Sequence, residues 1–580
     1  MSLTKVSYSM INGAVFNVLD YGAIGNGVAD DTVAIQAAID AASPQTLTDL
    51  AGTVFLPRGK YKITQPLNLT SDDGAFNRRG VKLMGEVNGS GDYVYGTKLV
   101  GATNGKAMIE YVDNDNPQIE NLTLTNAATN PSTVGIYQAR RTGGTAPSLW
   151  CGNGYFRNVT ITFSNDETTQ NNNYGTLGII NVSGEETTYD RCEVWANLPL
   201  ALSWSKTLRK AVSALTPSTY DDFTYSPVWA NVADITSGFS NTVFRTRSCR
   251  FIAKGFNAPV VLLHEVGSYF AYGDFTQKRS ATVSADGLNS TGYECWNAYQ
   301  IVIDGTAENM LTPLMFHRQA ESIDINLRGA PGTTGTAAGQ ICFAIDAPSF
   351  TLANARITLN NPGVLPHGLI TYIAPAGIGA EEPAQVTLRN CKIQTNQTFA
   401  NATIDPKILY KSINVQYDFF DTSMFATERG LKFPLVSKSI GTPATATALL
   451  RFVLPQVITN LSGFSATVIA DLHVSNAEAE GAGSPSSCFV KSMWQISRDS
   501  VPATLTITNQ TLNKLTASTN AAANNITDLT LTDVKTGFVE AELRVASVQT
   551  GANNAEAFVS GNVEVIYAGG YSRAPAVTIL

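Results

Sequence analysis

The stretch from Val15 to Ile63 constrains the fold of this chain more than any other. It opens with a short apolar run, a turn containing three glycines and then Asp30-Asp31-Thr32, where either carboxylate could accept the free amide hydrogens of a helix start. The next apolar residues recur at helical spacing: Ile35, Ala38, Ile39 and Ala42. Residues 52–63 alternate apolar and polar side chains around a Pro-Arg-Gly turn, which predicts a pair of strands. A helix with one apolar face and no partner helix must cover something else, so we expect it to cap the open end of stacked strands.

The glycine turn, Asp30-Asp31-Thr32 and Leu56-Pro57-Arg58-Gly59-Lys60-Tyr61 together resemble the opening of the β-helix proteins of the pectate-lyase superfamily, bacteriophage tailspikes in particular. The resemblance implies a right-handed parallel β-helix with an N-terminal capping helix. Asn26 departs from the family, which commonly has Asp between the two glycines, but Asn tolerates positive φ equally well. The motif indicates a fold and not a reaction, because β-helices carry lyases, hydrolases, esterases and plain binding proteins.

The composition fits an all-β repeat protein, since only 15% of the residues are charged and 47 are glycine. A net charge of −8 argues against a nucleic-acid partner, which would need a basic surface. The sequence has no run of 18 apolar residues, and its first ten residues lack the apolar core of a signal peptide. We therefore expect neither membrane insertion nor secretion by that route.

Seven cysteines occur, and four of them lie inside apolar strand patterns: Cys192, Cys249, Cys342 and Cys391. No Cys-x-x-Cys pair is present, so we expect small buried thiols and not disulfides or a zinc site. The sequence predicts no metal site and no cofactor.

A loose repeat runs from about residue 117 to residue 397. Its first phrase occurs at 119–126, 156–163, 189–195, 247–252, 299–304, 321–327, 353–360 and 388–394. A second, shorter phrase follows the first seven, at 135–138, 178–181, 200–204, 260–264, 314–317, 341–346 and 368–372. Each coil should contribute parallel strands to stacked sheets, with apolar residues inward and Thr, Asn and charged residues outward.

These patterns predict a lead-in at 1–14, an N-terminal cap at 15–80, a β-helix at 81–403, a connector at 404–430 and a C-terminal β-sandwich of jelly-roll type at 431–580. The spacing fails at 205–238 and 267–294, which we expect to rise from the solenoid as groove walls, because insertions in repeats collect on a binding face. The sandwich would serve trimerisation or carbohydrate binding.

Glycoside hydrolysis needs little more than two carboxylates on a rigid surface, and the sequence offers no Gly-x-Ser-x-Gly or His-Glu-x-x-His motif as a competitor. Aligning the phrases puts Glu193, Arg250 and Asp324 in one outward column, and Trp195, Asp304 and Asn326 in the next. It also puts His264-Glu265 over His317-Arg318. An outward carboxylate is usually an ordinary solvated surface group. The carboxylates beside the two insertions are better catalytic candidates, because acidic residues, aromatic residues and the expected groove walls occur together there. The predicted catalytic residues are Glu193, Glu265, Asp304 and Glu308.

Aromatic side chains near the insertions could stack on sugar faces, and basic ones could meet acidic sugars. The predicted substrate-binding residues are Trp195, Trp204, Trp229, Arg247, Arg250, His264, Tyr269, Tyr299, His317, Arg318 and Asp324, with Tyr272, Trp296 and Lys254 as neighbours. The plain alternatives are ordinary loop packing for the aromatics and surface ion pairs with Glu193 for the arginines.

The resemblance to tailspikes implies a protein of the virion that binds a bacterial surface polysaccharide, capsule or O-antigen, and cleaves it. We expect endo-glycoside hydrolysis first. A polysaccharide lyase comes second, with His264, His317, Arg318 or Tyr299 as the base that takes the C5 proton. A non-catalytic receptor-binding spike is the third hypothesis, and under it glycan would bind without being shortened.

The resemblance also implies a homotrimer and attachment to the phage tail or baseplate through the N-terminus. We expect the apolar tail with Val577, Ile579 and Leu580 to bury against another copy. The trimer would have a mass of about 185 kDa, three times the 61.8 kDa of one chain. The alternative is a monomer whose sandwich binds carbohydrate.

Overall fold

The computed structural model describes residues 15–44, 49–71, 78–87, 96–141, 152–163, 175–182, 184–203, 205–211, 220–231, 233, 243–254, 259–278, 291–308, 312–328, 343–345, 349–360, 364–365, 370–372, 384–395, 398–399, 408–418, 423–427, 430–439, 447–453, 464–476, 487–498, 505–516, 524–533, 540–549, 557–567 and 576–579. The chain divides into two compact units, residues 1–320 with 324–338 and residues 321–323 with 339–580. Within the described residues, no helix combines the length and the apolar character needed to span a membrane.

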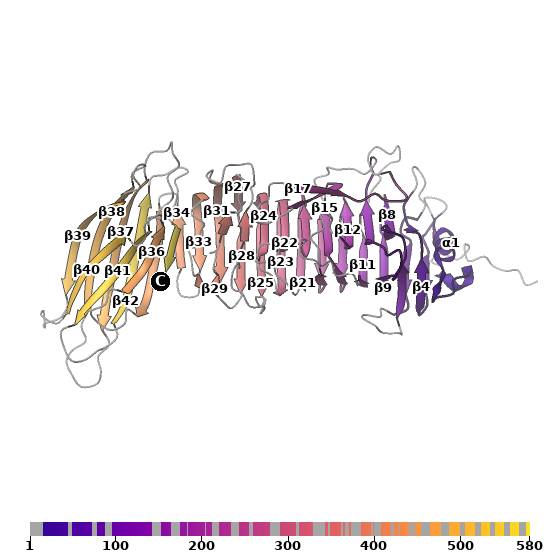
Figure 1. The fold of residues 1–580 in the computed structure, drawn as a ribbon, viewed down its shortest axis with the longest axis horizontal. Coiled ribbons are helices and arrows are strands. Elements are labelled where there is room, and N and C mark those ends of the chain that lie inside the picture. The colour runs from indigo at the N-terminus through magenta and orange to yellow at the C-terminus, as the bar shows by residue number, and fades with distance from the viewer. Residues whose placement is uncertain are drawn as a thin grey trace, which may run out of the picture. The chain divides into compact units, whose positions relative to one another are not determined.

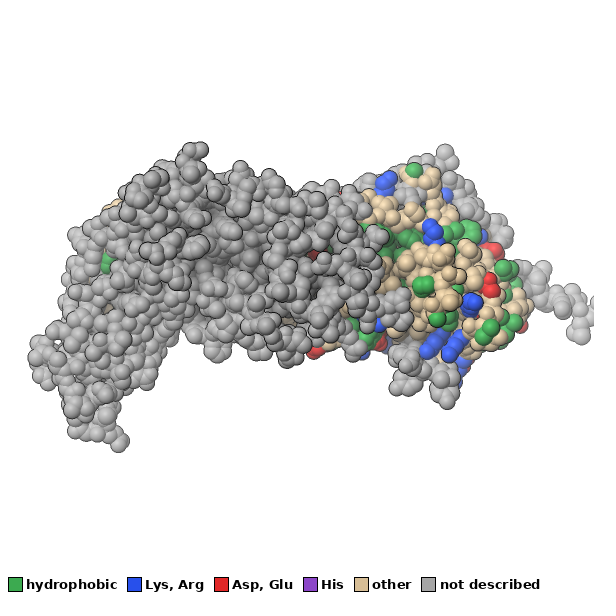
Figure 2. Space-filling view, viewed as in Figure 1, with side chains coloured by type: hydrophobic (Ala, Val, Ile, Leu, Met, Phe, Trp, Pro, Cys, Tyr) green, Lys and Arg blue, Asp and Glu red, His purple; other side chains and the backbone are tan. Residues whose placement is uncertain are grey.

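The N-terminal cap is built as the sequence predicts. The order is β1 (Val15–Asn17), a 3-10 helix (Val18–Tyr21), β2 (Asn26–Asp30), α1 (Thr32–Ala42), β3 (Thr53–Leu56), β4 (Gly59–Ile63) and β5 (Leu67–Asn68). The predicted apolar face of α1 is buried, and α1 packs against β1, β3 and β5, so it caps the end of the strand stack. On the face drawn in Figure 2, hydrophobic side chains also lie at the surface of this end. Exposed hydrophobic residues of the cap include Ile24, Val28 and Val33.

Of the two aspartates that the sequence offers for the helix start, Asp30 contacts the first helical amide and Asp31 binds the preceding turn. The Asp31 carboxylate makes no capping hydrogen bond to the helix. It accepts instead the amide hydrogens of Ile24 at 2.7 Å and Gly25 at 3.1 Å, and so fixes the glycine turn. Asp30 accepts the Thr32 amide hydrogen at 3.1 Å. The helix start therefore depends on Asp30, while Asp31 holds the turn before it.

The rest of the first unit is a right-handed parallel β-helix of three sheets, which confirms the predicted fold; Figure 1 shows its strands stacked in order. Sheet 1 contains β1, β3, β6 (Lys82–Gly85), β13 (Thr187–Asp190), β18 (Val243–Arg247) and the first halves of β9 (Gln118–Asn126), β11 (Tyr155–Thr162), β21 (Ser268–Lys278) and β23 (Gln300–Glu308). Sheet 2 contains β2, β4, β7 (Thr97–Gly101), β14 (Glu193–Ala196), β19 (Arg250–Ala253) and the second halves of those four strands, and β25 (Ile323–Arg328) pairs with β23. Sheet 3 contains β5, β8 (Ala107–Val112), β10 (Val134–Ala139), β12 (Leu177–Val182), β15 (Leu198–Ser203), β20 (Val261–His264), β22 (Thr291–Ala298) and β24 (Thr312–Glu321).

In five successive coils, a left-handed residue turns the chain from sheet 1 into sheet 2. Asn121, Asn158, Arg191, Ser248 and Gly273 occupy this corner in successive coils, and all have positive φ. The Asn158 Nδ2 donates to Asn121 Oδ1 at 2.8 Å, as expected for residues stacked one coil apart. Asn is favoured here because its short polar side chain tolerates this backbone conformation.

The interior of the solenoid is apolar, with a few small polar groups. Phe156 and Tyr189 stack in adjacent coils with ring centroids 5.2 Å apart. The free cysteines of the described residues are buried, which confirms the prediction of buried thiols for Cys192, Cys249 and Cys391. Cys342 lies outside the described residues.

The two predicted insertions are not groove walls where the structure describes them. Residues 268–278 and 291–298 form β21 and β22, which pair in register with the neighbouring coils and add a full coil to the solenoid. In the other insertion, β16 (Thr207–Ala211) and β17 (Tyr220–Thr224) form an antiparallel hairpin. We call residues 205–211 and 220–231 the arm, and it lies along the outer face of sheet 3, where the Tyr225 ring contacts that of Tyr137 at 4.5 Å.

The second unit begins with parallel strands and continues with antiparallel ones. The parallel part contains β26 (Phe343–Ile345), β27 (Ser349–Ala353), β28 (Arg356–Asn360), β29 (Val364–Leu365), β30 (Ile370–Tyr372), β31 (Ala384–Thr395), β32 (Thr398–Phe399) and β33 (Ile408–Asp418). β34 (Ser423–Thr427) pairs antiparallel with β33 and β35. The last strands form two antiparallel sheets, as a β-sandwich requires. The first sheet contains β35 (Gly430–Ser439), β42 (Ala557–Tyr567), β37 (Phe464–Asn476), β38 (Ser487–Arg498) and β39 (Leu505–Thr516). The second sheet contains β40 (Asn524–Asp533), β41 (Glu540–Gln549), β36 (Thr447–Val453) and β43 (Ala576–Ile579). The apolar tail thus pairs with β36 of its own chain, and the predicted domain boundaries stay predictions.

Candidate functional site

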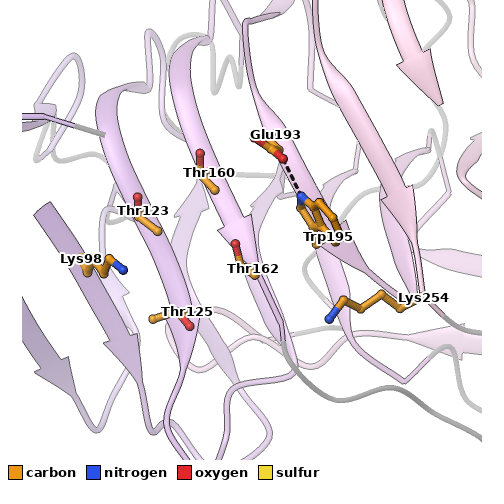
Figure 3. A pocket seen from close by; sticks show the side chains of 8 residues that line it. All are labelled: Lys98, Thr123, Thr125, Thr160, Thr162, Glu193, Trp195 and Lys254. Carbon is orange, nitrogen blue, oxygen red and sulfur yellow. Dashed lines mark hydrogen bonds between the residues drawn. The ribbon is translucent and has the colours of Figure 1, made fainter. Parts of the chain in front are cut away.

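A pocket of ≈ 310 Å³ lies on the outer face of sheet 2 in the first unit. Figure 3 shows its lining across β7, β9, β11 and β14, with Lys254 just after β19. The lining residues are Lys98, Thr123, Thr125, Thr160, Thr162, Glu193, Trp195 and Lys254. We call this site the sheet 2 pocket.

The floor of the pocket is a grid of threonines. Thr123 and Thr160 are in register with each other, and the same holds for Thr125 and Thr162 one step along the strands. They face outward because Leu124, between two of them, is fully buried in the solenoid. Each hydroxyl can donate one hydrogen bond and accept others, so the grid suits a ligand with many hydroxyl groups.

Glu193 and Trp195 continue the two threonine columns into the next coil. The Trp195 Nε1 donates to Glu193 Oε1 at 2.7 Å, and the Arg250 guanidinium lies 3.3 Å from the same carboxylate oxygen. Lys254 Nζ lies 5.9 Å from the centroid of the Trp195 ring, at the outer limit for a cation–π contact. Figure 3 shows the indole between Glu193 and Lys254, with Lys98 at the far end of the threonine grid. These contacts hold an aromatic ring and a carboxylate in fixed positions beside the grid.

Glu193 is the only carboxylate that lines this pocket in the described residues. Hydrolysis with two carboxylates requires them about 5–9.5 Å apart. Glu308 and Asp304 lie on β23, and the register places β23 three coils from Glu193. Coils are about 4.8 Å apart, so this separation is roughly 14 Å.

The predicted catalytic residues therefore do not converge. Asp304 accepts a hydrogen bond from Asn326 Nδ2 at 2.9 Å, and Glu308 accepts one from Gln277 Nε2 at 3.4 Å. Glu265 follows β20, beyond sheet 3, and has a φ of 56°. Among the four, Glu193 alone lines the sheet 2 pocket.

The predicted columns are correct in one place and wrong in others. Glu193 and Arg250 are in register, as predicted. Asp304 instead shares a column with Asp190, Arg247 and Tyr272. The error has two sources. The sequence predicts an insertion at 267–294, where the structure has a coil of the solenoid. In addition, β21 carries a bulge at Tyr272 to Asp274 that shifts its register.

The same missing coil separates the two histidines, because Trp296 stands between His264 and His317 in the register. The His264 side chain is buried, with Nδ1 3.1 Å from Ser203 Oγ. Tyr269 is also fully buried, and its hydroxyl lies 3.1 Å from Thr246 Oγ1. Neither ring is at the surface in this structure.

The remaining predicted binding residues are spread over the surface. Tyr299 and Trp229 are exposed, and Arg247 lies at the end of β18. Asp324 lies on β25. Trp204 and the side chains of His317 and Arg318 lie outside the described residues.

Sequence reasoning missed the threonine grid and Lys98. The usable signal was the Thr-x-Thr pattern at 123–125 and again at 160–162, in two consecutive repeat phrases at the same phrase position. Alternation in a strand puts both threonines of each pattern on one face. Stacked coils then place four hydroxyls together.

The arm is held on sheet 3 by one buried carboxylate. Glu110 of β8 accepts a hydrogen bond from Tyr225 Oη at 2.8 Å and from the amide nitrogens of Val228 and Trp229, the closest at 2.9 Å and 3.1 Å. Burial raises the pKa of Glu110, and these hydrogen bonds oppose that rise. Trp229 Nε1 also donates to the Pro66 carbonyl oxygen at 3.1 Å. The arm thus runs back along the solenoid to the cap.

Residues 15–189 match the family model described as rhamnogalacturonase A/epimerase, pectate lyase-like. This stretch is a pectate-lyase-like domain. It contains the cap and the threonine grid, and its last residue lies four positions before Glu193. The resemblance predicted from the opening of the sequence is thereby confirmed for this domain.

Curated relatives of this chain come from Azotobacter vinelandii. Mannuronan C5-epimerase AlgE6 is 33% identical over 157 residues, which is 25% of this chain and 16% of the relative. Mannuronan C5-epimerase AlgE1 is 45% identical over 73 residues, 13% of this chain and 5% of the relative. Alginate lyase 7 is 53% identical over 49 residues, 8% of this chain and 5% of the relative. The chain thus spans only a small part of the length of these relatives.

Solved structures resemble the chain at low identity. The gp42 tailspike of Acinetobacter phage vb_AbaP_AS12 gives a TM-score of 0.41 at 11% identity, with 87% of this chain and 81% of that chain covered. Geobacillus virus E2 ORF18 gives 0.38 at 12% identity, with 87% and 77% covered. Similarities of this size carry no information about activity.

Proposed function

We propose that this protein is a bacteriophage tailspike that binds and cleaves a bacterial surface polysaccharide, capsule or O-antigen, at the sheet 2 pocket. The observation that carries the proposal is the fixed Trp195 ring beside a carboxylate and a grid of hydroxyls, an arrangement suited to stacking and hydrogen bonding of sugars. The relatives are named for mannuronan and alginate, which supports a polysaccharide as the ligand of this chain. The tailspike assignment rests on the resemblance of the opening residues.

The pocket supports β-elimination better than hydrolysis. One carboxylate lines it together with Lys98 and Lys254, and Arg250 lies beside that carboxylate. In an elimination, cations neutralise the carboxylate of a uronic acid and make its C5 proton more acidic. A base takes that proton, a double bond forms between C4 and C5, and the C4–O bond breaks with protonation of the leaving oxygen. Glu193 and Lys254 are the lining groups in position to act as base or acid.

Hydrolysis is the second candidate, because Glu193 is a carboxylate held in a fixed orientation by Trp195. Glu193 would protonate the leaving oxygen, while a second carboxylate would act as a base and activate water. Product analysis separates the two reactions. Unsaturated uronate at the new non-reducing end indicates a lyase. A saturated non-reducing end, together with a water oxygen on C1 of the new reducing end, indicates a hydrolase.

The test of the site is depolymerisation of surface polysaccharides from a panel of encapsulated strains. Glu193→Gln should lower the rate by roughly two to four orders of magnitude, because the side chain keeps its shape but can no longer transfer a proton. Glu120→Gln is the matched control, since Glu120 pairs with Lys82 at 2.8 Å on sheet 1. Glu265→Gln, Asp304→Asn and Glu308→Gln test the other predicted acids. If Glu193→Gln cleaves as fast as the unaltered chain, the sheet 2 pocket is not the catalytic site.

We also propose that the protein forms a homotrimer of about 185 kDa, three times 61.8 kDa, that acts outside the bacterial cell and joins the phage tail through its N-terminus. The C-terminal tail does not support this by itself, because Val577 pairs with Phe452 of the same chain. Light scattering of the intact chain tests the trimer. A monomeric mass would refute it.

A further inference from the structure

Two adjacent coils of the first unit expose arginines and aromatic rings in matched pairs. The coil at 243–254 presents Arg245, Arg247 and Arg250, and the coil at 268–278 presents Phe270, Tyr272 and Phe275. Parallel register pairs Arg245 with Phe270, Arg247 with Tyr272 and Arg250 with Phe275. We call these six residues the arginine–aromatic strip.

The outward direction of the strip follows from strand alternation. Phe244 precedes Arg245, and Thr246 lies between Arg245 and Arg247; both are fully buried. Tyr269 and Ala271, at the corresponding positions of the next coil, are fully buried as well. Side chains two residues apart therefore share the outer face of sheet 1. Ser248 and Gly273 then turn the two coils with φ of 51° and 69°, so Arg250 and Phe275 lie on sheet 2.

The strip is partly open to solvent: three of its members are exposed, and Arg245, Phe270 and Phe275 are half-buried. Tyr272 is 47% exposed, the Arg250 side chain is 51% exposed, and Arg247 is an exposed residue as well. The Arg250 guanidinium carbon lies 5.3 Å from the centroid of the Phe275 ring, within the range of a cation–π contact. Among the ion pairs between described residues, Arg250 pairs with Glu193, whereas neither Arg245 nor Arg247 takes part in one.

We propose that the arginine–aromatic strip is a second glycan-binding surface, separate from the sheet 2 pocket, and that it takes acidic polysaccharide. The proposal rests on the proposed function, and it adds the substrate class. A sugar ring has an apolar face that packs on an aromatic ring, and an acidic sugar adds a carboxylate that an arginine binds with two parallel hydrogen bonds. The two coils are about 4.8 Å apart, so one acidic sugar can contact both members of a pair.

The charges around the strip set the direction of the bound chain. Asp190 and Asp304 occupy the same column as Arg247 and Tyr272, one coil to either side. A polyanion lying along the solenoid axis would cross both carboxylates. A polyanion lying parallel to the strands would avoid them and follow the strip from sheet 1 round the corner to Arg250. Arg250 contacts Glu193, so this path ends beside the sheet 2 pocket.

The acidic character of the whole chain argues against nucleic acid as the occupant. The net charge is −8, and the basic residues of the strip are bordered by aspartates. Nucleic-acid binding depends on a broad basic surface that releases counterions along the phosphate backbone. A flexible acidic glycan needs only a short basic path with rings for its sugars.

The experiment measures binding and cleavage separately in the intact chain. Binding of alginate is measured with the Glu193→Gln chain, which holds substrate without turnover, and dextran is the neutral probe. Adding Arg247→Ala and Tyr272→Ala should weaken alginate binding by roughly tenfold or more, which corresponds to about 1.4 kcal/mol, and leave dextran binding unchanged. Arg58→Ala is the matched control, because Arg58 is an exposed arginine of the cap that pairs with Glu86 at 3.0 Å.

In the chain with Glu193 intact, the same two substitutions should raise KM for long acidic substrates and leave kcat and the KM of short oligosaccharides unchanged. Unchanged alginate affinity and unchanged KM would overturn the proposal while leaving the depolymerase intact. Absence of cleavage of every polysaccharide, with strip-dependent alginate binding retained, would refute the proposed function and support the strip. Tighter binding of single-stranded DNA than of alginate, or a lower mass of the double variant in light scattering, would assign the strip to another partner and overturn the proposal.

Discussion

Asp274→Asn should remove a pH dependence of stability that is built into the solenoid. The bulge after Gly273 turns the Asp274 side chain inward, where it is 1% exposed and accepts the Cys249 amide hydrogen at 2.9 Å. Burial raises its pKa from 3.8 to about 7, although hydrogen bonds from Thr246 and Cys249 partly oppose the rise. The titratable groups around it, Tyr269, Tyr293 and Cys249, have pKa values raised by burial and stay neutral in this range.

The direction of the effect follows from the two states. Below pH 3.8 the carboxyl is protonated in both the folded and the unfolded chain, so its titration does not lower the free energy of unfolding. Between pH 3.8 and about 7 the unfolded chain releases the proton while the folded chain keeps it, so the free energy of unfolding falls as pH rises. One pH unit is worth about 1.36 kcal/mol, so the full loss is about 4 kcal/mol and is complete above pH 7.

The assay is urea unfolding of the intact chain at about pH 4.5 and about pH 8. The neutral carboxamide of Asp274→Asn keeps an oxygen for the Cys249 amide. At about pH 4.5 the unfolded carboxyl is already partly ionised, so the variant should exceed the unaltered chain there by only about 1 kcal/mol, and at about pH 8 by up to about 4 kcal/mol. Asp304→Asn, an exposed aspartate on a neighbouring coil, should keep the original pH dependence. Parallel pH profiles for the Asp274→Asn and unaltered chains would refute the reasoning.

Three further changes test how the first unit is held together. Glu110→Ala removes the acceptor of the arm, and since each hydrogen bond to a charged group is worth about 1.5–3 kcal/mol, limited proteolysis should cut within 220–231 faster than in the unaltered chain. Unchanged proteolysis would show that other contacts hold the arm. Asp31→Asn should raise hydrogen exchange at the Ile24 amide by roughly tenfold or more, and normal protection there would show that the turn does not depend on this carboxylate. Gly178→Ala would drive its methyl group into Val194 and the Pro199 carbonyl and should cost about 1–3 kcal/mol in thermal unfolding, so an unchanged melting temperature would contradict the packing.

Alternation within single strands made the coil interior predictable. Ile35 and Ile39 on the cap helix, and Cys192 and Cys249 in the coils, are buried as their local spacing predicts. These are properties of a few neighbouring residues, because a helix or strand fixes which side chains share a face. Glu193 and Arg250 also paired as predicted, since their repeat phrases have the same length between apolar residues.

The sequence by itself therefore determined the fold class, the cap, the inward residues and one pair of the site. Only the tertiary structure decided which coils are neighbours, because hydrogen bonds between distant residues set the register, and the bulge at Gly273 shifts it without any change in alternation. For the same reason the coil at 268–298 could not be distinguished from an insertion, and Asp304 was placed in the wrong column. The arm shows the same limit, since Tyr225 reaches a carboxylate 115 positions away, at Glu110. Side chains from separate coils meet in the sheet 2 pocket only after the solenoid has closed, because stacking, and not local sequence, brings their faces together.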